Sequence, residues 1–138
     1  MSETTDFETA RAERALAWSR YVTARPSQAP PESPLRTVGS QGYCFGEVWS
    51  RPGLDVRARR FISLACAGLA GAETPIRSHI YGALKSGDIS FPEMQEAILH
   101  FGVYAGLPKA SYMEQVANEC WAQIQSEGGP VSQAPPTV

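Results

Sequence analysis

Two histidines, His79 and His100, are the side chains best suited to move a proton near neutral pH, because an unperturbed imidazole has a pKa of about 6.5. His79 lies three residues after Ile76 and four before Ala83, within or beside the apolar stripe of an expected helix. It is either a catalytic group or a neutral core residue that is hydrogen-bonded to a carbonyl or carboxylate. The spacing alone leaves both interpretations open.

His100 shares a helix face with Glu96 and Tyr104, which lie four residues before and after it, and Glu93 lies one turn before Glu96. A carboxylate at this spacing can orient an imidazole, but an exposed pair beside the buried face has the same pattern. A metal site built from these residues and His79 is disfavoured, because two histidines are few and the Glu-x-x-His spacing of helical di-iron sites is absent.

The segment GEVWSRPGLD, residues 46–55, gathers an acid, an aromatic ring, a guanidinium and a tight turn. Arg51 offers a planar fork that suits a carboxylate, and Glu47, one helical turn earlier, can pair with it or act as an acid or base. A surface ion pair at a helix end explains the same residues. The sequence lacks the signatures of serine hydrolases, P-loop proteins and dinucleotide-binding proteins.

The composition indicates a single domain of 138 residues with a formal net charge of −2. Nucleic-acid binding is disfavoured because it needs a strong positive field, and no apolar run approaches the roughly 18 residues of a membrane span. The N-terminus is acidic and polar, unlike a secretory signal, so we expect a cytoplasmic protein. Cys44, Cys66 and Cys120 lack metal-binding spacing and are expected to be reduced thiols.

Helix caps and apolar periodicity predict an all-α fold of five to six helices without strands. We expect an N-terminal helix over residues 1–25 and a Pro-rich extended arm over residues 26–41, where proline excludes a regular element. The helical domain is expected over residues 42–125, and a disordered tail over residues 126–138. Because a core of roughly 85 residues buries only about two-thirds of its unfolded surface, self-association is also expected.

Within the helical domain, Asp55 is expected to cap a helix that ends near Gly68, and Thr74 followed by Pro75 to begin the next. The stripe expected to face the core on the first of these is Ile62, Ala65, Cys66 and Leu69. The second is expected to bury Ile76, Ile80, Ala83 and Leu84 and to end at Gly87.

A capping box of Ser90 and Glu93 predicts a further helix that ends near Tyr104. The last helix is expected from about Lys109 to Gln125. Its core-facing stripe is expected to be Tyr112, Met113, Val116, Ala117, Cys120 and Ile124.

The chain resembles the carboxymuconolactone decarboxylase family over about residues 42–124, in GEVWSRPGLDVRARRFISLA and SHIYGALKSGDISFPEMQEAILHFGVYAGLPKASYMEQVANECW. The most specific parts are the Trp and Arg-Pro-Gly-Leu turn and the His-x-x-x-Ala/Gly-x-x-x-Gly run. The resemblance implies a compact, alkylhydroperoxidase-like, all-α domain. It also implies a trimer or hexamer with sites near subunit contacts.

Alkylhydroperoxidase-like members of the wider superfamily carry C-x-x-C-x-x-x-H, in which one thiolate attacks peroxide and the other resolves the intermediate. Counting back from His79 places those cysteines at Ala72 and Pro75, so both sulfurs are missing. The decarboxylase branch also lacks the pair. It retains a histidine matching His79, an acid at Glu47 and the turn at Arg51.

The resemblance therefore implies a cofactor-free decarboxylase of a small unsaturated carboxy-lactone or related cyclic acid, similar to 4-carboxymuconolactone. No metal or organic cofactor is needed, because such a substrate contains its own electron sink. His79 is expected to transfer the proton, Arg51 to hold a remote carboxylate, and Glu47 to orient His79 or relay a proton. The residues expected to bind the substrate or exclude water are Trp49, Glu96, His100 and Tyr104.

Two alternatives from other classes remain. A thiol-dependent hydroperoxide reductase would depend on Cys44, Cys66 or Cys120. A non-catalytic oligomeric module would bind a small molecule, and both histidines would only pack. The Pro-rich arm is expected to wrap a neighbouring subunit or to cover a site.

Overall fold

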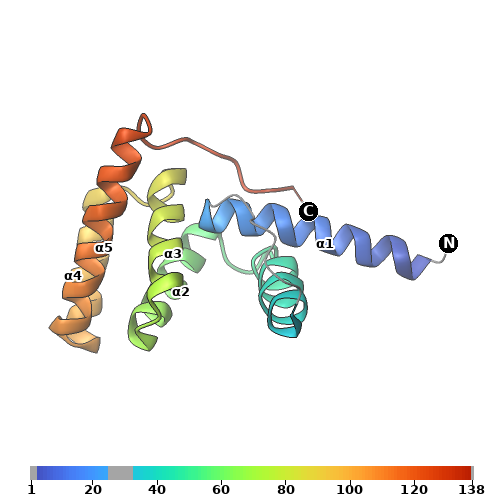
Figure 1. Cartoon of the computed structure of the whole chain (residues 1–138), viewed down its shortest axis with the longest axis horizontal. Coiled ribbons are helices and arrows are strands. Elements are labelled where there is room, and N and C mark those ends of the chain that lie inside the picture. The colour runs from blue at the N-terminus through green and yellow to red at the C-terminus, as the bar shows by residue number, and fades with distance from the viewer. Residues whose placement is uncertain (1–2, 25–32, 138) are drawn as a thin grey trace.

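The computed structural model describes residues 3–24 and 33–137, and over these ranges it contains six helices and no strand (Figure 1). The helices are α1 (Glu3–Thr23), η1 (Leu35–Val48), α2 (Val56–Ala70), α3 (Glu73–Ser86), α4 (Phe91–Ala105) and α5 (Leu107–Ser126). The predicted all-α fold is confirmed. None of the helices in the described part of the chain is long and apolar enough to cross a membrane.

Helices α2 to α5 form the main body, with α3 packed against α2 and α5, and α4 packed against α5 (Figure 1). The predicted inward residues of α3 are all buried, as are most of those predicted for α5. The largest buried side chains of this core are Leu64, Ile76, Ile80, Leu84, Ile89, Met94, Ile98, Met113, Val116 and Ile124. The α3 and α5 stripes therefore meet as the sequence predicts.

Local capping signals explain several helix ends. The Asp55 carboxylate accepts a hydrogen bond from the Ala58 N–H at 2.7 Å, which satisfies one of the unpaired donors at the start of α2. Ser90 and Glu93 form the predicted reciprocal box, at 3.2 and 3.0 Å. Gly87 ends α3 at a φ of 77°, a left-handed conformation that glycine adopts without strain.

The beginning of α3 differs from the prediction. The capping position is Ala72, whose side chain makes no capping bond, and the helix begins at Glu73 instead of after Thr74. Pro75 still lies in the first turn, where its missing N–H costs no helical hydrogen bond.

The predicted core stripe of α2 is wrong. Ile62 and Leu69 are 53% and 57% exposed, and Ala65 and Cys66 are exposed as well. The buried positions of α2 are Arg60, Leu64 and Gly68. Gly68 explains the rotation, because a Cβ there would lie 2.5 Å from the Met113 sulfur, so the missing side chain lets α5 approach α2 closely.

The Pro-rich arm is also partly wrong. Residues 25–32 lie outside the described part of the chain, but a π-helix begins at Leu35, directly after the last proline of the segment, Pro34. From that point every residue has a backbone donor, so proline no longer excludes a helix. The Trp49 N–H closes the last turn on the Cys44 carbonyl, five residues earlier, at 3.0 Å.

Helix α1 packs its C-terminal half on η1 and α3, while its first turns extend beyond the body (Figure 1). The tail was predicted to be disordered, yet it follows a defined path as far as residue 137. The Val131 N–H donates to the Lys85 carbonyl at 2.7 Å, and the Tyr81 hydroxyl donates to Glu127 at 2.5 Å. Polar contacts with α3 hold this segment, which is why an apolar stripe did not reveal it.

Candidate functional site

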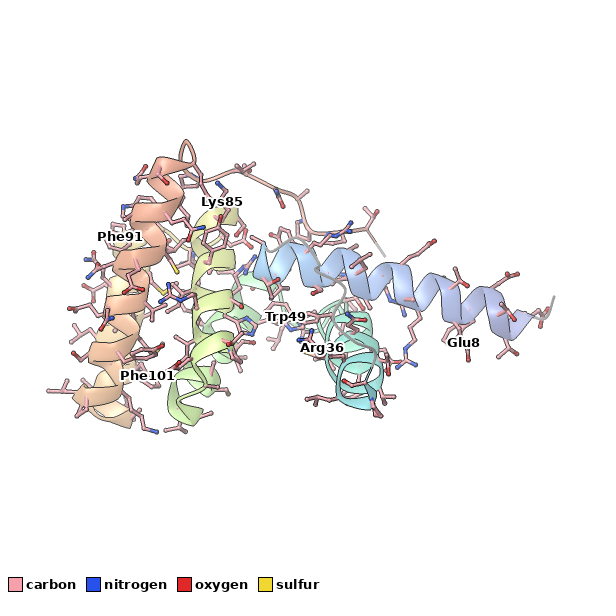
Figure 2. All side chains as sticks on the ribbon, viewed as in Figure 1. Glu8, Arg36, Trp49, Lys85, Phe91 and Phe101 are labelled. Atoms are coloured by element: carbon pink, nitrogen blue, oxygen red, sulfur yellow. The ribbon has the colours of Figure 1, made fainter. Side chains whose placement is uncertain are left out.

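His79 and Trp49 lie together at the junction of α3 and η1. Their rings are nearly parallel, with an interplanar angle of 14° and centroids 6.2 Å apart. Figure 2 shows Trp49 close to the C-terminal end of α1, and the side chain is only 4% exposed. The structure therefore brings together two of the residues that the sequence singled out.

Helix α1 supplies most of the surface that covers Trp49. Trp18, Tyr21 and Val22 form one buried cluster with Trp49, and Cys44, Phe45 and Val56 pack against its edge. None of the α1 residues was predicted to belong to the site. Their apolar spacing was visible in the sequence, but their contact with Trp49 joins two distant parts of the chain.

The environment of His79 favours a neutral imidazole. Burial of the ring, and then the positive charge of Arg60, lower the pKa of His79 from 6.5 to about 4. The residue as a whole is half-buried, but its Nδ1 atom is fully buried and has no hydrogen-bond partner among the described residues. At neutral pH His79 is therefore uncharged, in contrast to the expectation of a pKa near 6.5, and because Nδ1 is fully buried, a ligand can reach only the exposed part of the ring.

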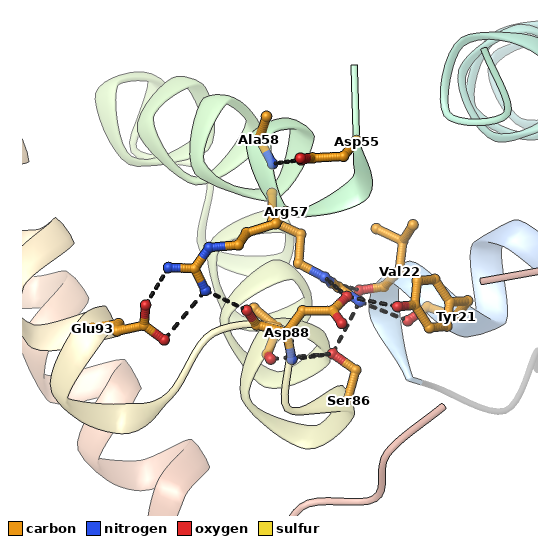
Figure 3. Close-up of polar contacts among 10 residues, drawn as sticks. Tyr21, Val22, Asp55, Arg57, Ala58, Ser86, Asp88 and Glu93 are labelled. Atoms are coloured by element: carbon orange, nitrogen blue, oxygen red, sulfur yellow. Dashed lines mark hydrogen bonds and ion pairs between the residues drawn. The ribbon is translucent and has the colours of Figure 1, made fainter. Parts of the chain in front are cut away.

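Arg60 is at the centre of a buried polar network between α1, α2 and the end of α3 (Figure 3). Its Nε donates to Asp88 at 2.8 Å, Nη1 to the Val22 carbonyl at 2.9 Å, and Nη2 to the Tyr21 carbonyl at 3.2 Å. The Tyr21 hydroxyl also donates to Asp88, at 2.6 Å. Burial and this hydrogen bond raise the pKa of Tyr21 to about 12, so the phenol stays protonated.

Glu47 is bound by α1 rather than by Arg51. Its carboxylate lies 2.8 Å from the Arg11 guanidinium, and the Arg14 Nε donates to the neighbouring Gly46 carbonyl at 2.6 Å. Arg51 is exposed, and among the described residues its guanidinium has no ion pair. The spacing of Arg11 and Arg14 on one helix face was the available signal for this contact, and sequence reasoning missed it.

The candidates on α4 lie elsewhere. Glu96 and His100 line an apolar groove of about 870 Å³ between α2 and α4, which His79 does not line. The His100 ring contacts the Tyr104 ring, with centroids 5.2 Å apart, and Tyr104 is 83% exposed. Within one chain, therefore, Tyr104 does not exclude water from His79.

The three cysteines lie in different environments. Cys44 is half-buried, Cys66 exposed and Cys120 buried. Burial raises the pKa of the Cys44 thiol, which lowers the fraction of reactive thiolate. Among the described residues no group of three His, Cys, Asp or Glu side chains is arranged to hold a metal ion.

Known proteins match the part of the chain that contains these residues. The model of the carboxymuconolactone decarboxylase family matches residues 40–119. A 4-carboxymuconolactone decarboxylase from Acinetobacter baylyi is 34% identical over 82 residues, which are 59% of this chain and 60% of that protein. A nitrosuccinic acid decarboxylase from Metarhizium robertsii is 36% identical over 66 residues, 48% of this chain and 46% of that protein. The chain thus spans less than two-thirds of either relative, and α1 lies outside the residues that the family model matches.

Proposed function

Because this chain belongs to the carboxymuconolactone decarboxylase family, we propose that it removes carbon dioxide from a small carboxylic acid without a bound cofactor. The observation that carries the proposal is the neutral, half-buried imidazole of His79, which lies parallel to the ring of Trp49. Both relatives are named as decarboxylases, and this supports the reaction class.

The reaction needs an electron sink in the substrate. When the bond between carbon and the carboxylate breaks, its electron pair moves into the conjugated group, carbon dioxide leaves, and a proton then adds to carbon. A lactone carbonyl or a nitro group accepts such an electron pair, and both groups occur in the names of the relatives' substrates. We therefore propose a substrate with one of these groups, with an unsaturated carboxy-lactone as the first candidate.

The neutral state of His79 changes its expected role. A neutral imidazole donates a hydrogen bond to the oxygen on which negative charge develops, as an electrophilic partner of the sink. That negative charge also raises the pKa of His79, because an opposite charge nearby favours the imidazolium. His79 therefore takes up a proton from solvent when the substrate anion binds, and it then delivers that proton to carbon.

The remaining residues have supporting roles in this proposal. The exposed guanidinium of Arg51 binds a remote carboxylate, which anchors the substrate without stabilising the departing group. Glu47 holds the end of η1 through Arg11, and it relays a proton to His79 only when that ion pair opens. Trp49 excludes water from one face of the imidazole.

We also propose that the protein forms a trimer or hexamer and that Glu96, His100 and Tyr104 bind substrate across a subunit contact. Exposed apolar side chains on α2, on α4 and at the start of α5 support this proposal, because isolated chains seldom expose large apolar patches. These side chains are Ile62, Leu69, Leu99, Val103 and Leu107. Light scattering should give the mass of three or six chains, and the mass of one chain would contradict the proposal.

The test of the reaction supplies 4-carboxymuconolactone, nitrosuccinic acid and an organic hydroperoxide to the purified protein in parallel. We expect carbon dioxide release from at least one acid and no loss of hydroperoxide. His79→Gln should lower kcat by about 100-fold or more while the oligomeric mass is retained. Full turnover by that variant would overturn the role of His79, and hydroperoxide loss that depends on Cys66 would favour the thiol alternative.

A further inference from the structure

Arg60 caps the C-terminal end of α1 from a different helix. The carbonyls of Tyr21 and Val22 belong to the last turn of α1, where no later helical N–H can pair with them. The guanidinium satisfies both carbonyls and places a positive charge at the negative end of the helix dipole. Arg60 is only 1% exposed, and burying its charge costs free energy. The two hydrogen bonds and the ion pair with Asp88 offset that cost.

The same turn of α1 is the surface on which Trp49 packs. Tyr21 and Val22 share a buried cluster with Trp49, and the ring of Trp49 lies parallel to that of His79. The Arg60 guanidinium also lies 5.1 Å from the centre of the Tyr21 ring. A continuous series of contacts therefore runs from Arg60 through α1 and Trp49 to the imidazole.

We propose that Arg60 is a positioning residue for the reaction: by binding Asp88 and the last carbonyls of α1, it holds Trp49 against His79. The catalytic consequence rests on the proposed decarboxylation, whereas the positioning itself does not. The residue does not touch the substrate in this role. Arg60 instead sets the orientation of the His79 imidazole and its shielding from water.

The charge of Arg60 gives the proposal a second observable. Arg60 disfavours the imidazolium of His79, as stated above. The other titratable groups around the pair are Tyr21 on α1 and Cys44 on η1, whose pKa values are both raised, and Asp88, which binds Arg60 itself. Loss of the guanidinium should therefore raise the pKa of His79 for two reasons. The positive charge disappears, and a loosened α1 leaves the imidazole less buried.

The experiment follows the two imidazoles by NMR titration, because the chain has only two histidines and the exposed His100 is an internal control. In Arg60→Gln we expect the pKa of His79 to rise by about one unit or more, while the NMR signals of His100 stay as in the wild type. Arg60→Lys keeps the charge but cannot reach both α1 carbonyls and Asp88 with one ammonium group. It should keep the pKa of His79 closer to that of the wild type.

Turnover separates positioning from simple destabilisation. We expect kcat to fall about 10-fold to 100-fold in Arg60→Gln with little change in KM, and Arg60→Lys to recover part of the loss. If Arg60→Gln does not fold, the double variant Arg60→Gln/Asp88→Asn avoids an unpaired carboxylate and answers the same question. A folded variant with the wild-type pKa at His79 and wild-type kcat would overturn the proposal. A shifted pKa in a protein without any decarboxylase activity would support the positioning and reject the proposed reaction.

Discussion

Replacement of Gly82 by alanine provides a direct test of how α1 is held. Gly82 lies in α3, and a Cβ added there would be 2.7 Å from the carbonyl carbon of Val22, closer still to its oxygen, and 3.1 Å from the Cα of Thr23. All three neighbours are backbone atoms, so no side chain can turn away. Because carbon atoms pack at about 3.5–4.0 Å, α1 must move by about 1 Å.

That movement has a calculable cost. The hydrogen bond of 2.9 Å from Arg60 to the Val22 carbonyl would stretch beyond the range of a useful bond. A lost bond to a charged group costs about 1.5–3 kcal/mol, and overpacking of a tight contact costs about 1–3 kcal/mol. Alanine restores about 0.5–1 kcal/mol through its better helix propensity. We therefore expect Gly82→Ala to destabilise the docking of α1 by about 2–5 kcal/mol.

Urea unfolding at a fixed protein concentration measures this change, with amide hydrogen exchange to locate it in α1. Gly53→Ala is the matched control, because no atom lies within 4 Å of its Cβ position and its backbone is not left-handed. The control should stay within about 0.5 kcal/mol of the wild type. If Gly82→Ala were as stable as the wild type and protected α1 equally well, the close approach of α1 to α3 would be wrong.

Three further predictions follow from local contacts. The pKa of His79 is about 4 in the folded state and 6.5 when unfolded, so between these pH values the unfolded chain binds a proton that the folded chain does not. The free energy of unfolding should therefore fall by up to about 3 kcal/mol as the pH decreases from 6.5 to 4, and urea titrations of His79→Asn should show a flatter slope. The hydrogen bond from Arg57, followed by those within the capping box, lowers the pKa of Glu93 to about 2, so its contribution to folding stability is present above pH 4.5 and fades towards pH 2. An unchanged dependence of stability on acid pH in Glu93→Gln would contradict this. Ser90→Ala removes the side-chain acceptor of the box and should cost about 1 kcal/mol in urea unfolding, whereas a loss near zero would mean that water replaces the cap.

Sequence predicted the features that depend on neighbouring residues. The box of Ser90 and Glu93, the Asp55 cap and the glycine end of α3 at Gly87 are all set within a few positions, and each is present. The buried face of α2 was not predicted, because two sets of residues both follow helical spacing: Ile62 with Leu69, and Leu64 with Gly68. Which face is buried depends on the approach of α5, and no local pattern contains that information.

The candidate site shows the same division. His79 and Trp49 were identified individually, but Trp49 packs on α1, and the lowered pKa of His79 depends first on burial and then on Arg60. The sequence does not single out Arg60, because its partners lie on α1 and after α3. Sequence alone did not predict that Glu96 lines a groove that His79 does not line, because this depends on how the helices pack.

The position of α1 has a consequence for the chemistry of this candidate site. The family match begins at residue 40, yet α1 provides the buried surface on which Trp49 rests. A protein that kept every matched residue but exchanged its N-terminal helix would present the same imidazole in a wetter or drier setting, with a different proton affinity. We therefore expect that replacement of α1, with residues 40–119 kept, would change the proton affinity of His79.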